Sequence, residues 1–284
     1  GMDLPLAVMI TIPEPWANNS IMSQKKKDFY QYYATMMEPW DGPASILFSD
    51  GDIMGAVLDR NGLRPSRYYI TTDDYLILSS EVGVLEIEPE RIKVKERLRP
   101  GKMLLVDTVK GEVIDDNELK DSYANMQPYG EWLDRNLVEL KDLKIPNERV
   151  IEHRGEDLSR LQKAFGYTYE STKDTILPMA RNGAESIAAM GIDSPIPVLS
   201  KDQQPLFNYL FAQVTNPPID CIREEVVTST TTYIGKDGNL LEENAINCQV
   251  LKIHNPILTN TDLMKIRSMK REGFKVVTLP ITYY

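Results

Sequence analysis

Cysteine and histidine are scarce in this chain. Its 284 residues include two cysteines, Cys221 and Cys248, and two histidines, His153 and His254. Two cysteines do not make a disulfide scaffold, which fits a reducing compartment. None of the four residues stands at the CxxC or HxxxH spacing that zinc sites use. The scarcity argues against a structural metal and leaves little material for a general base or a nucleophile.

Long apolar runs, clustered basic residues and glycine-rich phosphate motifs are also missing. No run of 18 apolar residues exists, so no membrane-spanning helix is expected. The first fifteen residues lack the basic region and cleavage site of a signal peptide. The net charge is -10, from 32 basic and 42 acidic residues, and no basic face for nucleic acid is visible. We therefore expect a cytoplasmic protein without nucleic-acid or membrane partners.

Both ends of the chain suggest an excised fragment. Gly1 precedes Met2, as it does when an expression tag has been cleaved. Residues 274–284 have the composition of a strand, and no further element closes it. We expect the chain to be part of a longer protein.

The first half has helical signals followed by strand signals. The apolar run Leu6–Ile12 predicts a strand, and Ser23–Met37 predicts a helix that Ser23 caps and Pro39 ends. Short apolar segments joined by Asp-Gly and Asn-Gly turns then predict an antiparallel sheet. Residues 117–143 are polar and suggest a helical linker. The predicted strands are 45–48, 53–58, 67–71, 75–79, 102–107 and 112–114.

The second half has a helical and then an α/β texture. Helix 262–271, ended by Gly273, followed by strand 275–279, predicts an αβ unit with parallel strands. No repeat of 20–50 residues is visible. The other predicted elements are helices 157–165, 173–182, 185–190, 205–214 and 222–227, and strands 195–199 and 249–253.

The most distinctive string is Asp59–Pro65, which we call the arginine turn. Asn61-Gly62 can supply positive φ, and Arg60, Arg64 and Arg67 come close together. They could clamp an anion or a carboxylate, or they could tie the turn to nearby carboxylates. We predict that Arg64 pairs with a carboxylate or with backbone carbonyls of its own half.

A second dense cluster is Asn216–Asp220 with Arg223-Glu224-Glu225. Paired carboxylates could do acid–base work, but the same residues suit the electrostatics of a helix start. Cys221 lies near that start, which would lower its pKa, yet it has no local histidine. Cys248 has still less support as a nucleophile. From the residues alone we predict two folded units without a convincing active site.

Several strings together resemble a known family. Four of them resemble the C-terminal part of the class II glutamine amidotransferase domain of glutamate synthase large subunits. The Asp-x-Asn-Gly-x-Arg-Pro and Ser80-Glu81 strings also resemble glutamine phosphoribosylpyrophosphate amidotransferase, but Ser66-Arg67-Tyr68 and the first string favour glutamate synthase. The four strings are 37–44, 58–68, 80–83 and 98–103.

The second half is similar to the start of the central domain of the same family. The strings that carry this resemblance are 161–168, 211–220 and 222–225. The resemblance implies an α+β then α/β fold. Residues 1–120 would be part of an amidotransferase sandwich, 121–150 a helical linker, and 151–284 part of a central domain resembling a degenerate barrel.

The resemblance also implies an activity for a longer parent. Such a subunit hydrolyses glutamine and passes ammonia through an internal tunnel to a flavin barrel, where 2-oxoglutarate becomes glutamate. FMN and an iron–sulfur cluster are its cofactors. Its partners would be the remainder of the large subunit and a small subunit or other electron donor. NAD(P)H and ferredoxin stay open as donors.

This chain departs from the family in ways that matter for activity. The family nucleophile is an N-terminal cysteine, whereas this chain begins Gly1-Met2-Asp3. The oxyanion-hole Asn-Gly and the glutamine-binding residues lie upstream of the matched strings, and Asn61-Gly62 is not that pair. The flavin barrel and the cluster cysteines would lie beyond Tyr284. We therefore assign no catalytic, cofactor-binding or metal residue.

We expect a structural piece and ammonia-channel wall that is inactive alone and hides exposed sheet edges by docking or self-association. Two alternatives remain. The chain could be a stand-alone glutamine amidohydrolase that uses Cys221 or Cys248. It could also be an acidic protein-binding module whose arginine turn docks a partner carboxylate.

Overall fold

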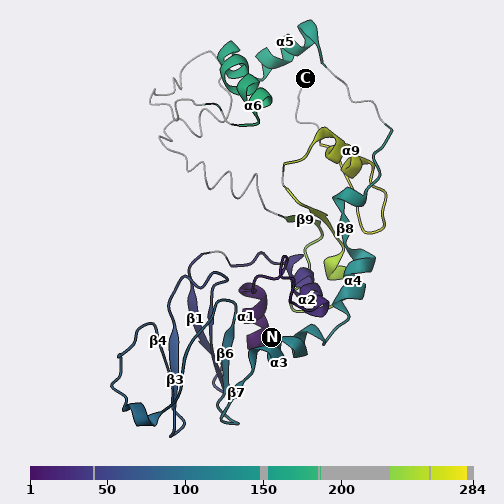
Figure 1. Ribbon diagram of the computed structural model, residues 1–284. Helices are drawn as coiled ribbons and strands as arrows, with labels where there is room; N and C mark the ends of the chain where they lie inside the picture. Colours follow the sequence, from purple (N-terminus) through teal and green to yellow (C-terminus); the bar gives the residue numbers. More distant parts are fainter. Residues whose placement is uncertain (41, 148–152, 185, 187–230, 256, 280–284) are drawn as a thin grey trace, which may run out of the picture. The chain divides into compact units, whose positions relative to one another are not determined.

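The computed structural model describes the chain except residues 41, 148–152, 185, 187–230, 256 and 280–284 (Figure 1). The chain divides into two compact units. The first unit comprises Gly1–Leu143, Thr232–Ile253 and Met269–Val277. The second comprises the described residues of Lys144–Thr231, His254–Ser268 and Thr278–Tyr284. The first unit is therefore assembled from three separate stretches of sequence.

Helix α1 (Leu4–Thr11) stands where a strand was predicted, so that prediction is wrong. A proline in the first turn is compatible with a helix start because its missing N–H has no intrahelical partner there. Leu6, Met9 and Ile10 are buried at helical spacing. The run is apolar on all sides, and a fully buried short helix and a buried strand give the same sequence pattern.

Helix α2 (Gln24–Ala34) confirms the predicted helix and its cap. The Ser23 hydroxyl accepts a hydrogen bond from the Lys26 N–H at 3.4 Å. Helices α3 (Asp116–Ala124) and α4 (Tyr129–Asn136) follow in the stretch that was predicted as a linker, and α3 is capped by Asp115. Tyr129 and Leu133 of α4 belong to the main core of the first unit. The boundaries at 120 and 150 stay a prediction.

Two antiparallel sheets confirm the strand pattern of the first half. A four-stranded sheet has the order β1-β2-β6-β7, and a three-stranded sheet has the order β4-β3-β5. The sequence did not predict β5, since charged residues alternate along it. The strands are β1 (Ser45–Ser49), β2 (Ile53–Leu58), β3 (Arg67–Thr71), β4 (Leu76–Ser79), β5 (Ile92–Arg97), β6 (Met103–Asp107) and β7 (Glu112–Ile114).

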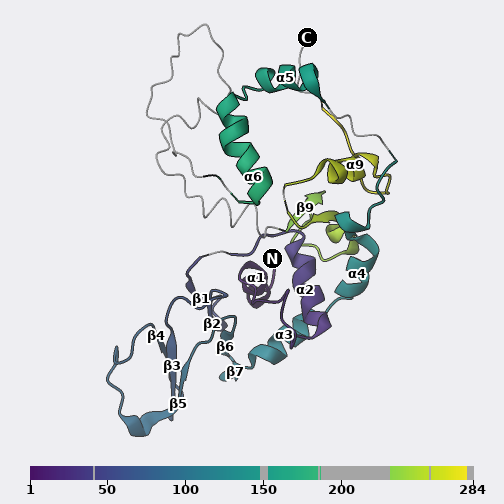
Figure 2. The same cartoon turned by 45° about the horizontal axis from the view of Figure 1, so that its top comes forward.

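The four-stranded sheet lies between a helical layer and the three-stranded sheet (Figures 1 and 2). Met103 and Leu105 of β6 pack with the buried faces of the helices in one core. On the other face, Ala56 and Leu58 of β2 pack with Leu98 and Leu104 against the three-stranded sheet in a second core. Alternation along β2 and β6 thus fills both cores from one sheet.

A third sheet joins distant parts of the sequence. Strand β10 (Val250–Ile253) pairs in parallel with β8 (Val138–Glu139) and antiparallel with β9 (Thr232–Gly235). The strand predicted at 249–253 is confirmed. Residues 232–253 therefore belong to the first unit, although they follow α4 by more than 90 residues in the sequence.

The second unit is described through its helices. Helix α5 (Gly155–Ala164) confirms one prediction. The helix predicted at 173–182 appears as a π-helical stretch η3 (Ser171–Ile176) continued by α6 (Leu177–Asn182), with Gly183 at φ 62° ending it. Helix α9 (Asn260–Ser268) ends before Gly273. The elements predicted at 195–199, 205–214 and 222–227, and nearly all of 185–190, lie outside the described residues.

Residues 275–279 do not form a strand, so the predicted αβ unit is wrong. Phe274 is half-buried and the five residues after it are exposed. An apolar sequence specifies a strand only when a neighbouring strand supplies the ladder, and none pairs with this segment among the described residues. No helix in the described ranges is long and apolar enough to cross a membrane.

A buried lysine holds three loops of the first unit together. Lys120 of α3 is 3% exposed. Its Nζ lies 2.9 Å from Asp116 Oδ1 and 3.2 Å from Glu14 Oε1, and it donates to the Gly101 carbonyl at 2.6 Å. Such a buried charge is tolerated because all its donors have partners. The lysine ties the loop after α1 to the turn before β6.

We expect Lys120→Met to lower the free energy of unfolding by about 3 kcal/mol, because Glu14 loses its cation and Asp116 keeps only Lys102. Urea unfolding followed by circular dichroism measures the loss. The matched control is Lys110→Met, which removes an exposed lysine paired with Asp107 and should change stability little. Equal losses in the two variants would contradict the assignment.

Candidate functional site

A buried aspartate organises the arginine turn. Asp59 is 2% exposed and follows β2 directly. Its carboxylate accepts from the N–H groups of Asn61 at 3.0 Å, Leu63 at 3.2 Å and Ala44 at 3.1 Å. Burial pushes the pKa of Asp59 upward, but these backbone hydrogen bonds outweigh it and the pKa lies below its usual value. The loop is therefore built around a carboxylate.

Gly62 lets the turn pack tightly on its neighbour. Its φ of 62° lies in the left-handed region, as the Asn-Gly pair predicts. A Cβ at this position would fall 2.3 Å from Pro100 Cγ. Ala44, the arginine turn and Pro100 come from three of the four strings that carry the family resemblance in the first half. The fold brings those three strings together.

The prediction for Arg64 is wrong. Arg64 is exposed, and its side chain makes no hydrogen bond or ion pair with any described residue. Arg60 is also exposed but does have a partner. Arg64 therefore does not clamp the turn, and the carboxylate of Asp59 accepts hydrogen bonds from its N–H groups. Three neighbouring arginines form a sequence pattern, whereas the single aspartate that precedes them does not.

An open groove of about 510 Å³ lies beside Arg60. Its walls are mainly proline, asparagine and one tryptophan, and none of these side chains is charged or nucleophilic. It holds one carboxylate, Glu14, whose Oε1 is already within reach of Lys120 and accepts from the Tyr30 hydroxyl. The lining residues are Pro13, Glu14, Pro15, Trp16, Ala17, Asn18, Asn19, Pro39 and Arg60.

The other feature of interest is a cluster of tyrosines around one glutamate, which we call the tyrosine–glutamate cluster: Tyr32, Tyr33, Tyr129 and Glu243. The Tyr33 hydroxyl donates a short hydrogen bond to Glu243 Oε1, and the Tyr129 hydroxyl donates to the same oxygen at 3.3 Å. Burial raises the pKa of Tyr33 and Tyr129, and the nearby carboxylate raises both further. The phenols stay protonated and act as donors.

Tyr32 fastens the segment that follows Glu243. It is fully buried, and its hydroxyl donates to the Asn244 carbonyl at 2.9 Å and accepts from the Asn244 N–H at 3.1 Å. The Asn247 amide donates to the same hydroxyl at 3.3 Å. Its amide also donates to the carbonyls of Asn239 and Glu242 at 3.0 and 2.5 Å. Hydrogen bonds that join Asn244 and Asn247 to Tyr32 thus fix the segment 239–247 to α2.

Cys248, the cysteine that the structure describes, does not form a nucleophilic site. Cys248 is fully buried and donates to the Ala245 carbonyl at 3.3 Å. Burial raises its pKa to about 11, so the unreactive thiol dominates at neutral pH. Cys221 and the cluster 216–225 lie outside the described residues. His153 and His254 are both exposed.

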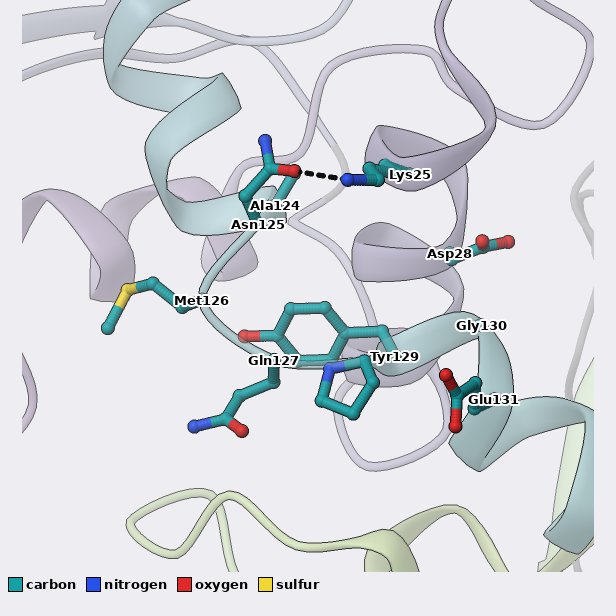
Figure 3. A pocket seen from close by; sticks show the side chains of 10 residues that line it. Lys25, Asp28, Ala124, Asn125, Met126, Gln127, Tyr129, Gly130 and Glu131 are labelled. Carbon is teal, nitrogen blue, oxygen red and sulfur yellow. Dashed lines mark hydrogen bonds between the residues drawn. The ribbon is translucent and has the colours of Figure 1, made fainter.

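An open depression of about 500 Å³ lies where α2 and α4 meet (Figure 3). Lys25 Nζ donates to Asn125 Oδ1 at 2.7 Å across one edge. Asp28 comes so close to α4 that a Cβ on Gly130 would fall 2.6 Å from its carboxylate oxygen. Opposite charges line it, but no nucleophile or paired base does. Within the described ranges no group of three metal-binding side chains occurs.

Comparison with known proteins decides the family. Residues 1–132 match the family model of class-II glutamine amidotransferases, and residues 160–284 match that of the glutamate synthase central domain. The large chain of NADPH glutamate synthase from Bacillus subtilis is 47% identical over 278 residues, which is 97% of this chain and 18% of that protein. The chain belongs to the glutamate synthase family.

Other relatives agree. NADH glutamate synthase of Schizosaccharomyces pombe is 44% identical over 299 residues, which is 100% of this chain and 14% of that protein. Ferredoxin-dependent glutamate synthase 2 of Synechocystis is 40% identical over 280 residues, covering 96% of this chain and 18% of that protein. The chain thus spans less than a fifth of these glutamate synthases.

The two family matches show that the tyrosine–glutamate cluster joins two different regions of the chain. Tyr32, Tyr33 and Tyr129 lie in the amidotransferase match, whereas Glu243 and Asn247 lie in the central-domain match. Residues from both matched regions therefore share one core in the first unit. Sequence reasoning missed this cluster, because nothing local marks Glu243. The tyrosines at helical spacing in α2 were the available signal.

We expect Asp59→Ala to lower the free energy of unfolding by about 2 kcal/mol, because three backbone N–H groups lose their acceptor. Arg64→Ala is the matched control from the same turn and should leave stability nearly unchanged. Urea unfolding of both variants measures the difference. A larger loss for Arg64→Ala would restore the arginine clamp.

Proposed function

We propose that this chain connects the amidotransferase and central regions of a glutamate synthase large chain and helps to wall the ammonia passage between them. The observation that supports this most is a single relative that is 47% identical over 278 residues, across 97% of the chain. The longer protein would form glutamate from glutamine and 2-oxoglutarate, with FMN and an iron–sulfur cluster as cofactors. An electron donor or small subunit would be its partner.

We infer that other parts of the longer protein hold those cofactors. An iron–sulfur cluster is held by about four cysteine thiolates, and this sequence has two cysteines. It also lacks a glycine-rich phosphate motif for FMN. These residues therefore do not fit either group. We keep the barrel-like topology of the central region as part of the proposal.

The connecting role is supported by how the two regions share buried polar groups. Gln31 of α2 donates to the Tyr233 hydroxyl at 2.6 Å and accepts from Lys252 Nζ at 3.0 Å. With the tyrosine–glutamate cluster, these side-chain contacts join the two matched regions, and the pairing of β8 with β10 joins the central-domain match to the stretch between the matches. Such contacts resist relative movement because each buried partner loses its bond when the regions part.

We expect the purified chain to release no glutamate from glutamine above a no-protein control. Glutamine hydrolysis needs a thiolate, a base within reach and an oxyanion hole. A coupled glutamate assay measures it, with the Cys221→Ser and Cys248→Ser variants as controls. Activity that Cys221→Ser abolishes would establish a stand-alone amidohydrolase instead.

The connecting role is tested in a full-length glutamate synthase that carries this sequence. We expect Glu243→Ala to raise the ratio of glutamine hydrolysed to 2-oxoglutarate converted above one, since a loosened junction lets ammonia escape. Arg64→Ala is the control and should leave the ratio at one. Both substrates are followed by chromatography in the same reaction. An unchanged ratio in Glu243→Ala, with the variant folded, would refute the channel-wall role.

A further inference from the structure

The outer face of the three-stranded sheet carries positive charge. Arg67 on β3 and Arg97 on β5 are direct cross-strand partners, and Tyr69 is opposite Lys95. Side chains alternate along a strand, so these four residues share one face. Lys95 Nζ lies 5.7 Å from the centroid of the Tyr69 ring. We call this surface, with Arg67, Tyr69, Lys95 and Arg97, the basic sheet face.

The opposite face of the same sheet is committed to the core. Tyr68, Leu76 and Leu78 pack there against residues of the four-stranded sheet. The basic sheet face therefore points away from that core, and the side chains of Arg67, Lys95 and Arg97 are exposed. Tyr69 is 8% exposed beneath them. The cations stand on two hydrogen-bonded strands, β3 and β5.

The two arginines lack a compensating charge. Like charges directly opposite on neighbouring strands repel, with Cβ atoms about 5 Å apart. Neither Arg67 nor Arg97 makes a side-chain hydrogen bond or ion pair with a described residue, although Arg91 at the edge of the same sheet pairs with Asp73 at 2.6 Å. The chain as a whole is acidic, with a net charge of -10. A bound external anion would relieve this repulsion.

We propose that the basic sheet face binds an acidic segment of a partner polypeptide. The planar fork of arginine matches a carboxylate with two parallel hydrogen bonds. Lys95 and Arg97 are two residues apart on one strand, about 7 Å, which is also the spacing of alternate carboxylates on an extended segment. Three cations on an otherwise acidic chain are too few for a nucleic acid, whose binding rests on many phosphate contacts.

The test measures binding of a fluorescein-labelled (Glu-Ser)₅ peptide to the 284-residue chain by fluorescence anisotropy at low salt. The variant Arg67→Gln/Arg97→Gln removes two charges from the basic sheet face. The matched control Lys236→Gln/Lys275→Gln removes two charges from exposed lysines outside this sheet. Arg67→Lys/Arg97→Lys keeps the charge but removes the guanidinium fork.

We expect Arg67→Gln/Arg97→Gln to weaken binding about tenfold, the lysine pair to fall between it and the parent chain, and the control to stay within about twofold. Thermal unfolding should show no loss of stability, because the substitution removes a repulsive pair. If that variant does not fold, Lys95→Gln is used in its place.

Three outcomes would overturn the proposal. The first is equal weakening by the basic-face variant and the control. The second is no weakening by either. The third is tighter binding of a labelled oligothymidylate of the same length than of the peptide, which would make the surface a nucleic-acid site.

Discussion

A phenol carried into a protein core needs a hydrogen-bond partner, and this requirement shapes the first unit. Tyr32, Tyr33 and Tyr129 are all buried on α2 and α4, where their rings stack edge to face with Phe29 and with one another. Neither helix can satisfy the three hydroxyls by itself. The segment around Glu243 and Asn244 supplies the acceptors. Strands β9 and β10 lie on either side of this segment in the sequence and position it.

Buried charges also link separate segments in the loops next to β2 and β6. Asp59 closes the arginine turn by accepting from backbone N–H groups, and Lys120 closes the loops around Gly101 by donating to a carbonyl and two carboxylates. In both cases one ionised side chain replaces several backbone hydrogen bonds that a loop cannot make for itself. The arginine turn and the turn at Gly101 both belong to strings that resemble the family. Each of these loops is therefore stabilised by one ionised side chain.

Sequence reasoning predicted the elements whose signals are local. The Ser23 cap, the Asn-Gly turn and the alternating strands of the first half all depend on neighbours within a few residues, and the structure confirms them. It failed where the outcome depends on distant partners. The apolar run of α1 and the run 275–279 had strand-like composition, but neither has a ladder to join. The role of Glu243 depends on tyrosines that are remote in sequence. The role of Asp59 depends on how its own turn folds.

The division of the first unit into three stretches has a consequence for its synthesis. Tyr32 and Asn244 are 212 positions apart, so the ribosome finishes α2 long before the partners of its hydroxyls exist. Closing so large a loop is slow, although its entropy grows only with the logarithm of length. During that interval the aromatic face of α2 lacks its cover. Truncation before residue 253 would leave this aromatic face uncovered and open to chaperones and proteases.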